Sequence, residues 1–79
     1  MSRKTILYVL QQAGSRPLTP DVISNYVNRL LPHPVTPEYV RVELSVLEGL
    51  GYVQRRASAL DPNELSWLVT DAGREVSTL

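Results

Sequence analysis

The sequence contains no cysteine. This absence excludes disulfide bonds, thiolate nucleophiles and cysteine-based zinc sites, and it removes any sign of an oxidising compartment. The sequence also lacks an apolar run of the roughly 18–20 residues that a transmembrane helix needs. Its N-terminus, Met1-Ser2-Arg3-Lys4, precedes a mixed stretch rather than the long apolar segment of a secretion signal. We therefore predict a cytoplasmic protein that is neither exported nor inserted into a membrane.

Histidine is scarce as well, and the only one, His33, lies between two prolines. A single imidazole without cysteine or a nearby pair of carboxylates makes a poor metal site, so we interpret His33 as an exposed loop residue. The serines lack a nucleophile-elbow sequence, and one histidine leaves little material for a base with its orienting partner. Glycine-rich nucleotide fingerprints are absent too. The sequence therefore predicts a protein that is not an enzyme and that uses no cofactor or metal.

Net charge is also missing. The 79 residues contain eight basic and eight acidic side chains, and the pI is near 6.5. A chain of this length forms one small domain, so we expect residues 1–79 to fold as a single unit around a core drawn from the 43 % apolar content. Small helical domains often bind nucleic acid, but such domains usually carry a basic excess. The neutral balance therefore argues against that function.

Apolar residues at helical spacing predict two helices at the start of the chain. The first spans Ser2 to Ala13 and is stopped by Gly14. The second follows Thr19-Pro20-Asp21, which offers a hydroxyl N-cap, a proline at the first helical position and a carboxylate in the first turn. It continues to Leu31, after which two prolines break the helix.

A third helix is predicted over residues 36–49. It begins at Thr36-Pro37-Glu38 with the same sequence of cap, proline and carboxylate. Apolar residues at spacings of three and four give it one buried face. This predicted buried stripe consists of Val40, Leu44, Leu47 and Leu50.

The rest of the chain predicts a β-hairpin and a short helix. Residues 52–56 and 65–70 are β-prone, and the turn residues Asp61-Pro62-Asn63 lie between them. Gly51 permits the reversal of direction before the hairpin, and residues 71–76 begin a last helical stub. The order predicts a mainly α fold with a small β-hairpin, namely a winged helix-turn-helix with three helices, a two-stranded wing and a C-terminal stub.

Two motifs resemble bacterial repressors of the ArsR, MarR and PadR types. Thr36 to Arg56, TPEYVRVELSVLEGLGYVQRR, is similar to their recognition helix and first wing strand, with a Leu-Glu-x-x-Gly-Φ-Val ending at residues 47–53. Residues 68–75 resemble the Leu-Thr-x-x-Gly-Arg signature that closes the wing in MarR and PadR relatives. We interpret Gly73 in this signature as a close-packing residue. The resemblance covers nearly the whole chain and implies a winged-helix transcriptional regulator of a prokaryote or its phage.

The resemblance also implies a mode of binding to double-stranded DNA. In such repressors the exposed face of the third helix enters the major groove and the wing reaches the flanking backbone. Carried over to this chain, helix 36–49 reads the groove and wing 54–64 contacts the backbone. Alternation along the wing strand sends Arg55 and Arg56 to opposite faces, so that one reaches phosphate while the stem of the other covers the core. The candidate contact residues are Tyr39, Arg41, Val42, Ser45, Arg55 and Arg56.

The charge of the third helix opposes this interpretation. Residues 36–53 contain one basic side chain, Arg41, and three acidic ones, which gives a formal charge of −2. Residues 1–35 carry four basic side chains and one acidic side chain, which gives +3. Arg41 can read a guanine edge or pair with Glu38 on the same helical surface, and the sequence leaves both open. The overall neutrality therefore hides a polarised surface.

A second interpretation is a winged helix that binds protein, such as an adaptor or a phage protein that captures a host factor through its acidic third helix. Leu60 supports this alternative because it places an apolar residue in the predicted wing tip, Ala57-Ser58-Ala59-Leu60, where DNA-reading wings are more often basic. Other apolar or aromatic candidates for exposure are Tyr39, Val42, Val46 and Trp67.

A homodimer also stays open. The repressors usually dimerise through helices that flank the wing domain, and here only three residues follow Val76. The first helix, with Leu7 and Tyr8 beside its core stripe, is the candidate for an isologous surface.

Overall fold

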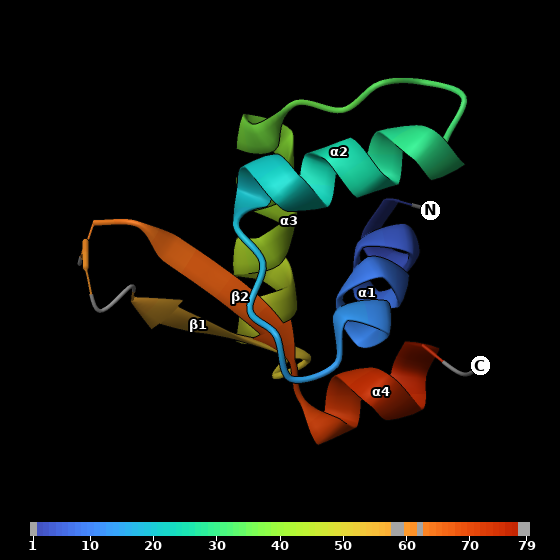
Figure 1. Cartoon of the computed structure of the whole chain (residues 1–79). Coiled ribbons are helices and arrows are strands. Elements are labelled where there is room, and N and C mark those ends of the chain that lie inside the picture. The colour runs from blue at the N-terminus through green and yellow to red at the C-terminus, as the bar shows by residue number, and fades with distance from the viewer. Residues whose placement is uncertain (1, 58–59, 62, 78–79) are drawn as a thin grey trace.

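The computed structural model describes residues 2–57, 60–61 and 63–77, and over these residues it contains four helices and one two-stranded sheet. In Figure 1, α2 lies in front of α3, α1 lies to the right of α3, the hairpin projects to the left, and α4 lies below α1. None of the described helices is long and apolar enough to cross a membrane. The predicted order of elements is confirmed, with these bounds: α1 Ser2–Ala13, α2 Pro20–Leu30, α3 Pro37–Gly49, β1 Val53–Ala57, β2 Leu65–Val69 and α4 Asp71–Ser77.

Side chains outside the helices fix where α2 and α3 begin. The hydroxyl oxygens of Thr19 and Thr36 accept hydrogen bonds from the backbone N–H groups three residues later, at 3.4 and 3.1 Å. Both predicted N-caps are therefore confirmed. The loop between these helices is held by Asn28, whose amide group donates to the Val35 carbonyl at 3.1 Å and accepts from the Val35 N–H at 2.6 Å. His33 lies exposed in this loop, as predicted.

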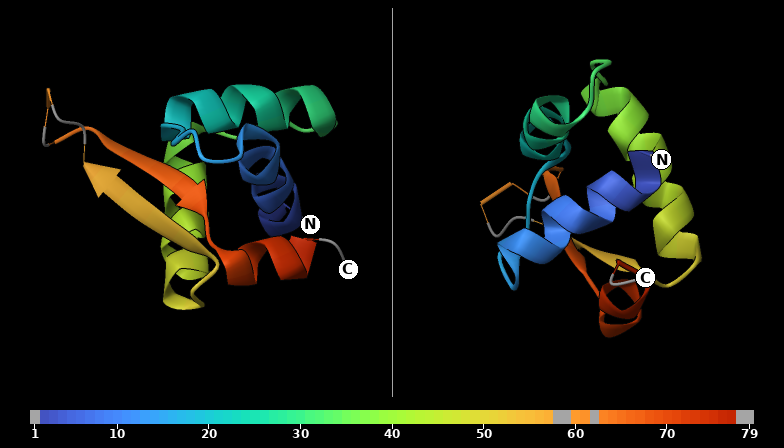
Figure 2. Two further views of the ribbon diagram at one scale, coloured as in Figure 1. Left: turned by 60° about the horizontal axis from the view of Figure 1, so that its bottom comes forward. Right: turned by 90° about the vertical axis from the view of Figure 1, so that its right-hand side faces the viewer.

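The wing is an antiparallel hairpin that extends away from the helices (Figure 2). Its register pairs Val53 with Val69 at the base and Arg55 with Trp67 further out. Trp67 also exchanges both backbone hydrogen bonds with Leu18, at 2.9 and 2.8 Å. This bridge attaches the segment before α2 to the outer edge of β2, and it thereby places the start of α2 beside the wing.

Side chains from all of the helices and both strands meet in one core. Helix α1 contacts α2, α3, α4 and β2. Because it has neighbours on several sides, a wide stripe of α1 is buried rather than a narrow one. The buried core includes Ile6, Leu7, Val9, Leu10, Leu18, Ile23, Val27, Val40, Leu44, Leu47, Val53, Trp67 and Val69.

Three expectations about exposure are wrong. Leu7 was a candidate for a dimer surface, but the neighbours of α1 leave it only 2 % exposed. Trp67 was a candidate for exposure, but it is 4 % exposed because it lies between the Leu18 bridge and β1. Leu50 was assigned to the buried stripe of α3, but it follows the end of that helix as the C-cap and is 56 % exposed.

Two glycines lie where the chain enters and leaves the wing: Gly51 precedes β1, and Gly73 lies in the first turn of α4. Gly51 has a φ of +82°, which confirms that the reversal before β1 uses a conformation that favours glycine. The Thr70 hydroxyl donates to the Gly51 carbonyl at 2.6 Å and accepts from the Gly73 N–H at 3.1 Å. Thr70 therefore ties the entrance of the wing to the start of α4, which explains the threonine and the glycine of the closing motif.

Replacing Thr70 by valine is expected to lower the free energy of unfolding by about 1–2 kcal/mol, because the junction loses two hydrogen bonds and the carbonyl of Gly51 loses its hydroxyl donor. Urea denaturation measures this change. Thr70→Ser keeps the hydroxyl and should be the milder substitution. Equal stability of the valine variant and the original protein would show that the hydroxyl does not hold the junction.

Candidate nucleic-acid interface

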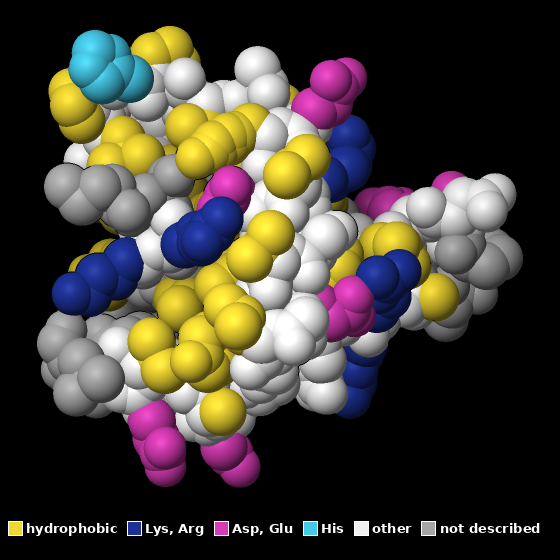
Figure 3. Space-filling model, turned by 180° about the vertical axis from the view of Figure 1, so that it is seen from behind, with side chains coloured by type: hydrophobic (Ala, Val, Ile, Leu, Met, Phe, Trp, Pro, Cys, Tyr) yellow, Lys and Arg dark blue, Asp and Glu magenta, His cyan; other side chains and the backbone are white. Residues whose placement is uncertain are grey.

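The outer face of α3 is the exposed side of the helix that the sequence assigned to DNA. Val40, Leu44 and Leu47 turn toward the core, and most of the residues between them face outward, although Glu43 and Val46 are half-buried. Val42 is 62 % exposed. Figure 3 views the molecule from the side on which α3 lies, and there uncharged and apolar side chains cover most of the surface between a few charged groups, some of which touch a group of opposite charge. The other predicted contact residues of α3, Tyr39, Arg41 and Ser45, are exposed as well.

A hollow of 340 Å³ lies between α3, the start of α2 and the wing. It brings together three predicted contact residues, Arg41 and Ser45 from α3 and Arg55 from β1. Tyr39, Val42 and Arg56 do not line it. The sequence-based prediction missed the other lining residues, because they become neighbours only through the Leu18 bridge and the hairpin register. They are Thr19, Pro20, Asp21, Asn63, Glu64, Leu65 and Trp67.

Arg55 joins the wing to the end of α3. Its Nε donates to Glu48 Oε2 at 2.8 Å and its Nη2 donates to Glu48 Oε1 at 2.5 Å. Its guanidinium also lies 5.3 Å from the centroid of the Trp67 ring. Hydrogen bonding from Arg55 lowers the pKa of Glu48, and the same contact raises the pKa of Arg55. Arg55 and Arg56 are both exposed, and Arg55 is the wing arginine that contacts Glu48 and Trp67.

The acidity of α3 is largely offset by arginines from other elements. Glu48 is paired with Arg55. Glu43 forms an ion pair with Arg3 of α1 and accepts a hydrogen bond from its Nε. Sequence reasoning missed these pairs because their members are separated by seven and 40 residues. No ion pair joins Arg41 to Glu38 among the described residues. The formal charge of −2 on residues 36–53 therefore overstates the negative charge near α3.

The pair between Glu48 and Arg55 predicts a pH-dependent stability. Folding lowers the pKa of Glu48, so its ionised form favours the folded state above the ordinary pKa of 4.5. This contribution is lost as the pH falls through the lower folded-state pKa. Glu48→Gln should therefore be slightly less stable than the original protein at neutral pH, and the difference should vanish in acid.

Chemical denaturation across a pH series measures this dependence. Glu64→Gln is the control, because Glu64 is exposed, lies outside the helices and makes no ion pair among the described residues. A Glu48→Gln difference that persists unchanged in acid would contradict an electrostatic origin.

The wing tip was predicted to be apolar, and its described part agrees. Leu60 is 97 % exposed, whereas Ser58 and Ala59 lie outside the described residues. No group of three or more His, Cys, Asp or Glu side chains in the described part of the chain could hold a metal ion.

No family model matches the sequence, and no curated protein matches it. Several solved structures share its fold. YusO from Bacillus subtilis superimposes with a TM-score of 0.83 at 19 % identity, over 98 % of this chain and 49 % of that one. A mutant of S. aureus MepR bound to an oligodeoxyribonucleotide gives 0.81 at 20 %, over 96 % and 51 %. FabT from Streptococcus pneumoniae in complex with DNA gives 0.74 at 24 %, over 99 % and 49 %.

The chain thus spans about half the length of each of these three proteins. At such identities the likeness concerns the fold. MarR itself is among the similar structures, so the predicted winged helix-turn-helix of the MarR type is confirmed as the architecture of this chain.

Proposed function

We propose that this protein is a transcriptional regulator that binds double-stranded DNA through the outer face of α3 and through the wing. The observation that carries the proposal is the exposed Arg41 beside Ser45 on α3, next to a projecting hairpin with the exposed Arg56. Two similar structures hold nucleic acid, which supports the same use of the fold here. A cytoplasmic protein of a prokaryote or its phage, without catalytic activity, fits this function.

Each group has a distinct task in this proposal. The outer face of α3 enters the major groove, where Arg41 can donate two hydrogen bonds to a guanine and the Val42 side chain can contact a thymine methyl group. Arg56 on the wing contacts phosphate, which fixes the register of the protein on the duplex. Arg55 acts as a positioning residue, because its bidentate contact with Glu48 holds the wing at a set place relative to α3.

The alternative of a protein-binding α3 has lost part of its support. It rested on the acidity of α3, and two of the three acidic side chains are paired with arginines. The exposed Leu60 remains in its favour. We therefore place DNA binding first.

Fluorescence anisotropy with labelled duplexes tests the proposal. At physiological salt the protein should bind unrelated duplexes weakly, with the micromolar to submillimolar Kd of non-specific complexes, and at about 50 mM salt it should bind them more tightly. Selection from a random duplex pool should enrich a preferred site. The logarithm of the affinity should fall linearly with the logarithm of salt concentration. Failure of every duplex to bind at low salt would overturn the proposal.

A further inference from the structure

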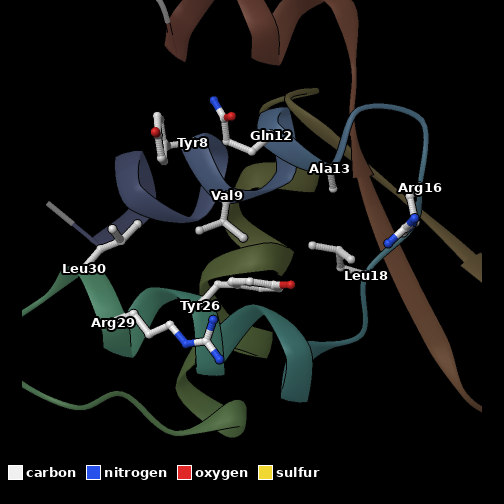
Figure 4. Close-up of a pocket in the computed structure, with 9 residues that line it drawn as sticks. All are labelled: Tyr8, Val9, Gln12, Ala13, Arg16, Leu18, Tyr26, Arg29 and Leu30. Carbon is white, nitrogen blue, oxygen red and sulfur yellow. The ribbon is translucent and has the colours of Figure 1, made fainter.

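We propose that the groove between α1 and α2 binds an acidic, amphipathic peptide segment of a partner protein. The groove has a volume of 480 Å³ and shares no lining residue with the hollow between α3 and the wing. In Figure 4, α1 and the loop after it form one wall and α2 forms the other. The lining residues are Tyr8, Val9, Gln12, Ala13, Arg16, Leu18, Tyr26, Arg29 and Leu30.

The walls of the groove contain apolar side-chain surface that remains exposed in the folded protein. Tyr8, Tyr26 and Leu30 are large side chains that remain about half exposed, and the buried Val9 and Leu18 lie beneath them. Aromatic side chains provide large contact areas at little cost in conformational entropy, and they are enriched at the centres of protein interfaces. Such walls fit the leucine or phenylalanine side chains along one face of a short helix.

Charge identifies the residues that flank the apolar face of this occupant. Arg16 and Arg29 both line the groove, and none of its described lining residues is acidic. Arg16 makes no ion pair among the described residues. The Arg29 guanidinium lies 5.3 Å from the centroid of the Tyr26 ring, within the range of a cation–π contact, and it makes no ion pair among the described residues. Apolar walls with only positive charge therefore favour a ligand that combines apolar and acidic side chains.

The same charges disfavour a second copy of this chain as the occupant. A two-fold contact between two such grooves would bring Arg16 and Arg29 of one copy toward the same arginines of the other. Like charges brought together at an interface are unfavourable. A partner of different sequence can instead supply the carboxylates that the groove lacks.

A pair of designed peptides tests the inference. The probe is a fluorescein-labelled 16-residue helical peptide with leucine along one face and glutamate at the positions that flank this face, and its counterpart carries lysine in place of each glutamate. At low salt the acidic peptide should bind at least tenfold more tightly than the basic one, as measured by anisotropy. Amide chemical-shift changes on binding should map to the residues of the groove.

Charge reversal in the protein makes the test specific. Arg16→Glu combined with Arg29→Glu should remove binding of the acidic peptide and favour the basic one. Lys4→Glu combined with Arg74→Glu is the matched control: it changes the net charge by the same amount at residues that line neither the groove nor the hollow beside α3, and it should preserve the preference for the acidic peptide. All four side chains to be reversed are exposed, and circular dichroism would verify that each variant is folded.

Three results would overturn the inference: equal affinity for the two peptides, binding unaffected by the double reversal, or shift changes that map to α3 and the wing. Sedimentation of the protein alone gives a fourth: a dimer that the double reversal dissociates would assign the groove to a second copy. DNA binding is tested separately, with substitutions on α3 and the wing. Peptide binding and DNA binding can therefore fail independently of each other.

Discussion

Replacing Gly73 by alanine should lower the free energy of unfolding by about 3 kcal/mol or more, the cost of forcing an extra carbon into a closely packed site. A Cβ at this position would lie 2.1 Å from the Tyr52 carbonyl oxygen and 2.7 Å from Val69 Cγ2. The backbone cannot easily move aside. The same Tyr52 oxygen accepts a hydrogen bond from the Thr70 N–H at 3.0 Å, and the Gly73 N–H is itself bonded to the Thr70 hydroxyl.

Gly49→Ala provides the matched control for this substitution. Gly49 is the last residue of α3, and a Cβ there would meet no atom within 4 Å. Alanine also has the better helix propensity, so this variant should be as stable as the original protein or up to about 1 kcal/mol more stable. Urea denaturation compares the two variants. If Gly73→Ala unfolds at the same urea concentration as Gly49→Ala, the close packing of α4 against the turn before β1 is refuted.

The elements of this fold could be predicted because short-range chemistry defines them. The entry of α2 follows from Thr19 and Pro20, and the entry of α3 follows from Thr36 and Pro37, since a cap and a proline act within one turn of the chain. The roles of Gly51 and Gly73 were also predictable, because the sequence around each glycine already indicated a reversal or a close approach.

The surroundings of the candidate site could not be predicted in the same way. The burial of Trp67 depends on a bridge to Leu18, which lies far from it in the sequence. The contact of Arg3 with Glu43 similarly depends on how α1 packs against α3. Such contacts follow from tertiary packing, and no local pattern records them. This is why the sequence overstated the acidity of α3, and why it missed the groove between α1 and α2.

Arg41→Ala should cause the largest loss of DNA binding. On the preferred duplex we expect an affinity about 10-fold to 100-fold lower, which corresponds to the roughly 1–3 kcal/mol of a bidentate contact to a base. Discrimination against other sites should decrease at the same time, because a base contact provides specificity that a phosphate contact does not. Arg41→Lys keeps the charge but removes the planar fork, so it should restore non-specific affinity without restoring discrimination.

Arg56→Ala should behave differently, and the comparison separates the two proposed tasks. Loss of a phosphate contact weakens binding to all duplexes nearly equally, and it reduces the slope of log affinity against log salt by about 1. Arg74→Ala is the matched control, because Arg74 lies on α4, where it pairs with Asp71. Anisotropy titrations of each variant on the preferred and an unrelated duplex, over a range of salt, give both quantities. If Arg41→Ala weakened both duplexes equally, Arg41 would contact phosphate rather than a base, and α3 would not read sequence through this residue.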